Sequence, residues 1–316
     1  MKTSQAVVGK WPSVLPMLGV SPDYLTGKHT ACPICGNGKD KFRFDDKDGN
    51  GTFFCNDCGA GGGWKLLELI HGWEFKTAAK EVDRVIGNAR TSVINKTNDT
   101  EKRRAKLNAL RKRVVPYDQS DKVIEYLKNR GIDIKTISTI THHLGFIPDL
   151  EYWEDGKLKG RYAAMTGLLI NGAQPSTYHM TFLEDGVKAN LSTSRKIMPP
   201  VTPIVGGAVR LFEYDVTLGI AEGIETALAA TQLFKIPTWA ALNANNLKSF
   251  AIPNTVTALH IFGDNDPSFT GQKAAYELGW RAVRKGLTVQ VHIPPKSNED
   301  WNDVLVKNMY MKGKQA

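Results

Sequence analysis

The sequence lacks long hydrophobic runs. No apolar stretch approaches the roughly 20 residues that a membrane-spanning helix requires, and lysines interrupt the N-terminal region. A short hydrophobic signal segment is missing as well. These absences exclude a membrane-embedded or secreted protein and predict a location in the cytoplasm. With 316 residues, 41% of them hydrophobic and 23% charged, the chain is long enough for about two domains with buried cores.

Cysteine is scarce, and all four cysteines lie in one short segment. They form two Cys-x-x-Cys pairs, Cys32 with Cys35 and Cys55 with Cys58. Such a cluster in a reducing compartment indicates a metal site rather than disulfides. Two such turns can place four thiolates around one structural zinc ion in a tetrahedron. His29 is an alternative ligand, but a surface histidine beside the site is the favoured interpretation.

Acidic residues are fewer than basic ones, 32 against 41, so the formal net charge is +9. This surplus favours a polyanionic partner, most simply nucleic acid. Between the cysteine pairs, the run Lys41-Phe42-Arg43-Phe44 would place its aromatic and basic side chains on opposite faces of a strand. We expect the phenylalanines to stack on the bases of single-stranded DNA and the basic residues to contact phosphates. The alternative is that the phenylalanines form the core of the zinc-binding domain.

The chain divides into four expected segments. A zinc ribbon with helices at Trp64–His71 and from about Thr77 is followed by a polar, basic linker, and then by an α+β lobe that opens with a helix from Asp121 to Arg130. The last segment alternates short apolar runs with helical patterns, which predicts an α/β domain with a parallel sheet covered on both faces. The expected boundaries are 1–88, 89–118, 119–215 and 216–316.

In the last segment, we expect four strands and two intervening helices. The strands are predicted at Val216–Ala221, Thr238–Leu242, Val256–Phe262 and Leu287–Ile293, and the helices at Ile224–Phe234 and Gly271–Lys285.

Acidic residues follow three of these strands. Glu222 comes after the first, Asp264 and Asp266 come after the third, and Asp300 and Asp303 come after the last. Because the functional crevice of an open parallel sheet lies beyond the carboxyl ends of its strands, we expect these carboxylates to converge. Carboxylate oxygens suit Mg²⁺ or Mn²⁺, which can assist displacement at phosphorus.

These residues resemble a known family. The segment from Glu222 to Ala229, Asp264-Asn-Asp266 and Asp300-Trp-Asn-Asp303 resemble the three motifs of the TOPRIM fold, which bacterial-type primases, topoisomerases and some nucleases share. The region from His179 to Arg210 resembles the part that precedes TOPRIM in phage and plasmid primases. The cysteine segment is similar to the zinc ribbon of satellite-phage α-type primase-helicases. The sequence departs from these relatives in having no Gly-x4-Gly-Lys-[Ser/Thr] motif, which argues against a P-loop ATPase in this chain.

The resemblance implies a DNA-dependent RNA primase in phage or plasmid replication in a bacterial host cell. Its implied partners are single-stranded DNA, nucleoside triphosphates and a separate replicative helicase. Glu222, Asp264 and Asp266 would hold catalytic Mg²⁺ or Mn²⁺, with Asp300 and Asp303 as additional or outer ligands. Glu225 is expected on a helix surface. The candidate contacts to nucleotide or template are Lys188, Arg195, Lys196, Arg210 and Lys273, the last of which fits a solvated helix face equally well.

Two alternatives remain open at this point. The same acidic set could hydrolyse phosphodiesters in a TOPRIM nuclease. The chain could also be a DNA-binding replication accessory whose acidic set is inactive. A topoisomerase is excluded because it would need a catalytic tyrosine in a second large domain.

Overall fold

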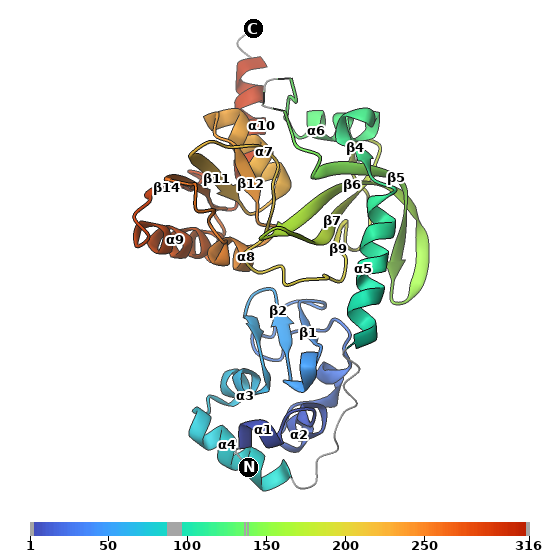
Figure 1. The fold of residues 1–316 in the computed structure, drawn as a ribbon, viewed down its shortest axis with the longest axis vertical. Coiled ribbons are helices and arrows are strands. Elements are labelled where there is room, and N and C mark those ends of the chain that lie inside the picture. The colour runs from blue at the N-terminus through green and yellow to red at the C-terminus, as the bar shows by residue number, and fades with distance from the viewer. Residues whose placement is uncertain (1–2, 87–96, 136, 138, 314–316) are drawn as a thin grey trace. The chain divides into compact units, whose positions relative to one another are not determined.

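The computed structural model describes residues 3–86, 97–135, 137 and 139–313 (Figure 1). The chain divides into two compact units, Met1–Asp99 and Thr100–Ala316. In the described part of the chain, no helix combines the length and the apolar character that crossing a membrane demands.

The first unit is built on a three-stranded antiparallel sheet with the order β1-β2-β3. Its core contains Trp11, Phe42, Phe44 and Phe53. A side chain at Gly63 could not fit, because its Cβ would lie 2.2 Å from the Trp11 ring. The elements are α1 (Thr3–Ala6), α2 (Trp11–Met17), η1 (Pro22–Leu25), β1 (Phe42–Phe44), η2 (Lys47–Gly49), β2 (Phe53–Cys55), β3 (Gly59–Gly61), α3 (Gly63–His71) and α4 (Phe75–Val85).

The second unit is built on one 11-stranded sheet with the main order β14-β13-β11-β12-β10-β6-β5-β4, and β7 joins it through β6. Its strands are β4 (Val115–Pro116), β5 (Leu144–Glu154), β6 (Lys157–Asn171), β7 (Gln174–Glu184), β8 (Val187–Lys188), β9 (Arg195–Ile197), β10 (Ala208–Val209), β11 (Thr217–Ala221), β12 (Thr238–Ala240), β13 (Ala258–Phe262) and β14 (Thr288–His292). Its helices are α5 (Thr97–Arg111), η4 (Tyr117–Gln119), α6 (Asp121–Asn129), α7 (Ile224–Phe234), α8 (Ala244–Ser249), α9 (Thr270–Val283) and α10 (Trp301–Gly313).

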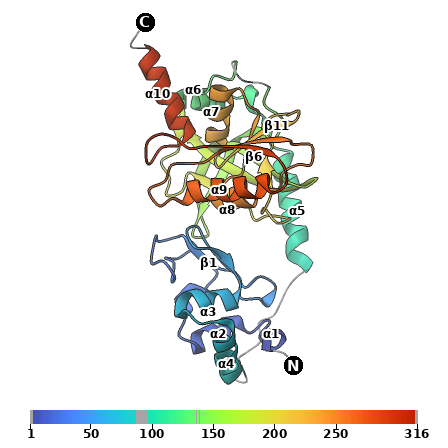
Figure 2. The same cartoon turned by 90° about the vertical axis from the view of Figure 1, so that its left-hand side faces the viewer.

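The predicted parallel sheet is present. Strands β12, β11, β13 and β14 are parallel neighbours, and each lies within a segment predicted as a strand. Leu218 and Ile220 of β11 face the core under α8 and α9, whereas Ala221 belongs to the core under α7 (Figure 2). Successive side chains of a strand point to opposite faces, so the helices cover both sides of the sheet. The predicted α/β class is therefore confirmed.

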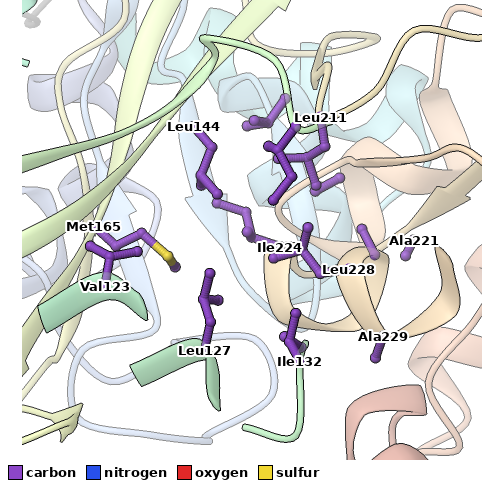
Figure 3. Close-up of a cluster of buried hydrophobic side chains, with 14 of the residues drawn as sticks. Val123, Leu127, Ile132, Leu144, Met165, Leu211, Ala221, Ile224, Leu228 and Ala229 are labelled. Carbon is purple, nitrogen blue, oxygen red and sulfur yellow. The ribbon is translucent and has the colours of Figure 1, made fainter. Parts of the chain in front are cut away.

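The lobe before residue 216 and the segment after it share one sheet and one hydrophobic cluster. Val209 of β10 pairs with Leu169 of β6 on one side and with Ala240 of β12 on the other. Figure 3 shows Val123 and Leu127 of α6 in the same cluster as Ile224 and Leu228 of α7. The boundary expected at residues 215 and 216 therefore lies inside a single compact unit.

The expected linker is in part a packed helix. Residues 89–96 of it lie outside the described residues, but α5 follows them. Leu107 and Leu110 of α5 are buried with Ile147 of β5 and Phe182 of β7. The basic stretch from Thr100 onward therefore belongs to the second unit.

Candidate functional site

The four cysteines come together as the sequence predicted. Their sulfur atoms all lie within 4.8 Å of one another, and the sulfurs of Cys32 and Cys58 are 3.8 Å apart. That separation is close to the edge of a tetrahedron with metal–sulfur bonds of about 2.3 Å. The amides of Ile34 and Cys58 donate to the sulfurs of Cys32 and Cys55, which fixes the thiolate orientations. The site fits one structural zinc ion.

His29 lies outside this cysteine group, as the favoured interpretation had it. Its ring Nδ1 is 2.8 Å from the backbone oxygen of Asp40, and the side chain is exposed. His29 therefore contacts the loop backbone at Asp40 and is not one of the grouped metal ligands.

The phenylalanines of β1 are not available to stack on bases. Phe42 is fully buried and Phe44 is 2% exposed. Phe42 stacks on Phe53 with ring centroids 5.6 Å apart. The expectation that Phe42 and Phe44 contact DNA was wrong, because the buried face of this small sheet is its aromatic face.

The basic side chains on the other face, Lys41 and Arg43, are partly exposed. The Lys41 ammonium lies 2.7 Å from the Asp57 carboxylate, and the Arg43 guanidinium lies 3.5 Å from Asp45. These exposed ion pairs are weak. Their cations could exchange a carboxylate for a phosphate, so DNA contact by Lys41 and Arg43 stays a prediction.

The sheet brings the acidic loops to its carboxyl edge. Glu222 follows β11 directly, and Asp264 follows the neighbouring strand β13 after one glycine. The loop after β13 is joined to the loop before α10, because the Asn265 amide donates to the Glu299 carbonyl and the Asn298 amide donates back to Asn265. Three segments that are distant in the sequence therefore meet at one edge.

The carboxyl groups at this edge interact electrostatically. Burial and the nearby Asp266 raise the pKa of Glu222 to about 7, although an amide hydrogen bond from Ala244 opposes the shift. Burial, followed by Glu222 and Asp300, raises the pKa of Asp264 to about 8. Burial also raises the pKa of Asp300. Gathering these groups thus makes their full ionisation unfavourable without a cation.

Asp266 has one oxygen committed to the protein. Its Oδ2 accepts a 2.8 Å hydrogen bond from the Gly271 amide in the first turn of α9. A Cβ at Gly271 would lie 2.6 Å from the Asp264 carbonyl oxygen and 3.0 Å from this carboxylate. The glycine therefore lets the helix start directly against the acidic loop, which fixes the orientation of Asp266.

Asp300 and Asp303 form a reciprocal cap at the start of α10. The carboxylate of Asp300 accepts from the amides of Asn302 and Asp303, and the Asp303 carboxylate accepts from the Asp300 amide. This is the capping-box arrangement. Their first role is therefore to hold the helix end, and a role as outer metal ligands stays a prediction.

The acidic residues fit a divalent cation that also keeps water or phosphate ligands. Oδ1 of Asp264 is buried without a hydrogen-bond partner, and its neighbours are carboxylates. The three carboxylates are not gathered as tightly as the cysteines. Among the described residues, only the four cysteines form a group of three or more possible metal ligands whose atoms all lie within 4.8 Å of one another. Mg²⁺ commonly takes only one or two carboxylates. Glu222, Asp264 and Asp266 would hold such an ion.

Glu225 is buried, not on a helix surface as expected. It is 4% exposed, lies 3.2 Å from the Lys188 ammonium, and accepts a 2.6 Å hydrogen bond from the Tyr126 hydroxyl. Burial alone would raise the pKa of Glu225, but Lys188, Tyr126 and Arg195 lower it to about 2. Glu225 therefore links α7 to α6 and β8 as a permanent anion.

Glu225, Tyr126 and His179 belong to one buried polar group that the sequence patterns did not reveal. His179 of β7 is 7% exposed, and burial lowers its pKa to about 4. The available signals were the charge of Glu225 inside an otherwise apolar helix and the tyrosine on the apolar face of α6.

Arg195 and Lys196 point in different directions because they are adjacent in β9. The Arg195 charge lowers the pKa of both Glu222 and Asp264, so it lies near enough to interact with the acidic edge. The Lys196 ammonium donates to the Trp153 carbonyl and lies 3.8 Å from the centre of the Tyr152 ring. Contact of either residue with nucleotide or template stays a prediction.

Arg210 and Lys273 are placed apart from each other. Arg210 donates to the Gly172 carbonyl, lies over the Trp239 ring, and lines a cavity of about 300 Å³ with Arg111 and His143. The Lys273 side chain is 74% exposed on α9. Contact of Arg210 or Lys273 with nucleotide or template therefore stays a prediction.

Comparison with known families identifies two domains in the chain. Residues 27–64 match the zinc-binding domain of primase-helicase, and residues 217–309 match the Toprim domain. Residues 101–211 match a domain of unknown function. These ranges contain the four cysteines and all the acidic residues of the sheet edge.

Solved primase structures are similar to this chain at low sequence identity. The zinc-binding and RNA polymerase domains of Aquifex aeolicus primase match with a TM-score of 0.43 and 15% identity, over 99% of this chain and 84% of that one. A DnaG primase catalytic domain bound to ssDNA gives 0.45 and 14%, over 70% and 83%. The primase fragment of the bacteriophage T7 primase-helicase gives 0.38 and 12%, over 91% and 98%. These overall similarities are weak, and the assignment of the two domains rests on the family matches.

Proposed function

We propose that this protein is a DNA primase, which synthesises short RNA primers on single-stranded DNA. One observation carries the proposal: a zinc-binding domain of the primase-helicase type and a Toprim domain occur in one chain, and the Toprim domain keeps Glu222, Asp264 and Asp266 at its sheet edge. The mutual shifts of the carboxyl pKa values support a cation there.

In this proposal, the second unit holds the reacting groups. Glu222, Asp264 and Asp266 bind Mg²⁺ or Mn²⁺, which would activate the primer 3′-hydroxyl and neutralise charge on the nucleotide phosphates. Arg195 lies near the same carboxylates and would receive the triphosphate, since a guanidinium can bind phosphate oxygens in pairs. Lys188, held by Glu225, has further donors for the same anion.

The first unit would bind the template. Its zinc ion would fix the turns around β1, and Lys41 and Arg43 would contact phosphates of the single strand. The protein would act with a separate replicative helicase in phage or plasmid replication, in the cytoplasm of a bacterial host.

Primer synthesis tests the proposal directly. Purified full-length protein is incubated with single-stranded DNA of mixed sequence, labelled nucleoside triphosphates and Mg²⁺. We expect short labelled products from the wild type and a loss of about 100-fold or more in Glu222→Gln, because the metal loses an anionic ligand. Glu184→Gln, an exposed carboxylate at the end of β7, serves as the matched control and should keep full activity.

Other outcomes identify the competing functions. Shortening of the DNA by the wild type, lost in Glu222→Gln, would show a nuclease. DNA binding without synthesis or cleavage, in the presence of either metal, would show a non-catalytic replication accessory.

A further inference from the structure

Helix α9 begins at the acidic centre and carries an unusual exposed face. Its first turn is bound to Asp266 through the Gly271 amide. Tyr276 and Trp280 are 59% and 63% exposed, and Phe269, just before the helix, is 69% exposed. Large aromatic side chains normally lose most of their surface to the core or to a partner. Their exposure here therefore requires an explanation.

The exposed aromatics lie on one stripe with basic residues. Lys273, Tyr276, Trp280 and Arg284 follow at intervals of three or four residues, which places them on the same side of a helix. The opposite side of α9 is buried against the sheet through Ala275, Leu278 and Ala282, so the stripe faces away from the core. We call these four residues the α9 stripe.

The chemistry of the α9 stripe fits a single nucleic-acid strand. The Arg284 guanidinium lies over the Trp280 ring at 4.8 Å, and the Lys273 side chain is 74% exposed. Proteins bind single strands by stacking bases on aromatic rings while cations follow the backbone. Tyr276 and Trp280 are separated by about 6 Å along the helix axis, one rise of four residues, which is comparable to the spacing of neighbouring bases in an extended strand.

We propose that the α9 stripe binds single-stranded DNA by base stacking and leads the strand to or from the acidic centre. Tyr276 and Trp280 stack on bases, and Lys273 and Arg284 contact phosphates. Phe269, which lies between Asp266 and the helix, offers a further ring at the end nearest the carboxylates. The choice of single-stranded DNA as the ligand rests on the proposed primase function. Binding of DNA by the α9 stripe does not itself require primer synthesis.

Equilibrium binding of a labelled oligothymidylate to the full-length protein tests this proposal. We expect Trp280→Ala to weaken binding about tenfold and Tyr276→Ala to a similar extent. Trp280→Phe should retain most of the affinity because it keeps a ring. Lys273→Ala should reduce the steepness of the salt dependence by about 0.7 in log–log slope. Trp153→Ala is the matched control, since Trp153 on β5 is 49% exposed.

The results separate this inference from the primase proposal. A DNA affinity that depends on Tyr276 and Trp280, in a wild-type protein that makes no primers, would leave the inference standing and reject the primase. Unchanged DNA affinity in Trp280→Ala and Tyr276→Ala would overturn the inference. A change confined to self-association, measured by sedimentation, would instead assign the stripe to a second copy of this chain.

Discussion

Glu225 is a buried charged residue, and its partners come from segments that are distant in the sequence. Lys188 and Tyr126 hold its carboxylate. We expect Glu225→Gln to lower the free energy of unfolding by about 3 kcal/mol at neutral pH, because the substitution leaves the Lys188 charge without its buried partner. Urea unfolding followed by circular dichroism measures this effect. Glu277→Gln should unfold as the wild type does, and an equal stability of the two variants would contradict the interpretation.

Glu222 and Asp264 make the stability of the metal-free protein depend on pH. Their pKa values rise from 4.5 and 3.8 to about 7 and about 8, so these two groups bind more protons in the folded state than in the unfolded state up to about pH 8. Histidines with lowered pKa values, His179 among them, act in the opposite sense mainly below about pH 6.5. The free energy of unfolding, measured with urea and without metal, should therefore fall from pH 7 to 8 by on the order of 1 kcal/mol.

Addition of Mg²⁺ supplies the control for this pH dependence. Since a bound cation favours the ionised carboxylates, it should flatten the decrease, and Glu222→Gln should show a shallower decrease without metal. A free energy of unfolding that rises over the same pH range in the metal-free wild type would contradict the assigned shifts.

At the scale of elements, the capping box of α10 gives a separate prediction. Asp300 accepts two amide hydrogen bonds at the helix start. We expect Asp300→Ala to cost about 1 kcal/mol of stability, whereas Asp300→Asn, which keeps an acceptor oxygen, should cost less. Thermal unfolding compares the two. If Asp300→Asn lowered stability as much as Asp300→Ala while also abolishing Mg²⁺ binding, charge rather than capping would be the main role of Asp300.

The elements that could be predicted from the sequence are those set by local patterns. Helix α7 occupies its predicted range, and β11, β13 and β14 lie within theirs, because burial on both faces produces short apolar runs. The Cys-x-x-Cys pairs predicted the metal site because each pair is itself a local pattern that places two sulfur atoms close together. Alternation in β1 showed which side chains share a face, but it could not show which face is buried, so Phe42 and Phe44 were assigned to the wrong side.

Other features depend on contacts between distant residues. Glu225 is 99 residues from Tyr126 in the sequence, and no local pattern connects them. The contact of Arg210 with the Trp239 ring depends on β10 lying between β6 and β12. The family matches end and begin on either side of the boundary expected at residue 216, but no local pattern shows that the two segments share a sheet within one compact unit.

At the scale of the molecule, the two units should respond differently to chelation. The first unit is small, and its four cysteines surround one site. Because metal binding supplies much of the folding energy of such units, we expect a strong zinc chelator to unfold it while the second unit stays folded. Limited proteolysis should then leave a resistant fragment that begins near residue 100. Re-added zinc should restore protection, and loss of the whole chain in one step would contradict the independence of the units.

The single sheet of the second unit restricts how this protein can be assembled from parts during evolution. Recombination preserves folding when the exchanged segment carries its own core. The cysteine-containing unit meets this condition. A segment beginning at residue 216 carries most of the core under α8 and α9, but it would separate β12 from β10 and strip α7 of Val123 and Leu127. An open strand edge and an exposed apolar helix face favour aggregation. We therefore expect Glu222, Asp264 and Asp266 to keep their arrangement only together with the strands and helices that pack against α7, whereas the cysteine-containing unit can be exchanged.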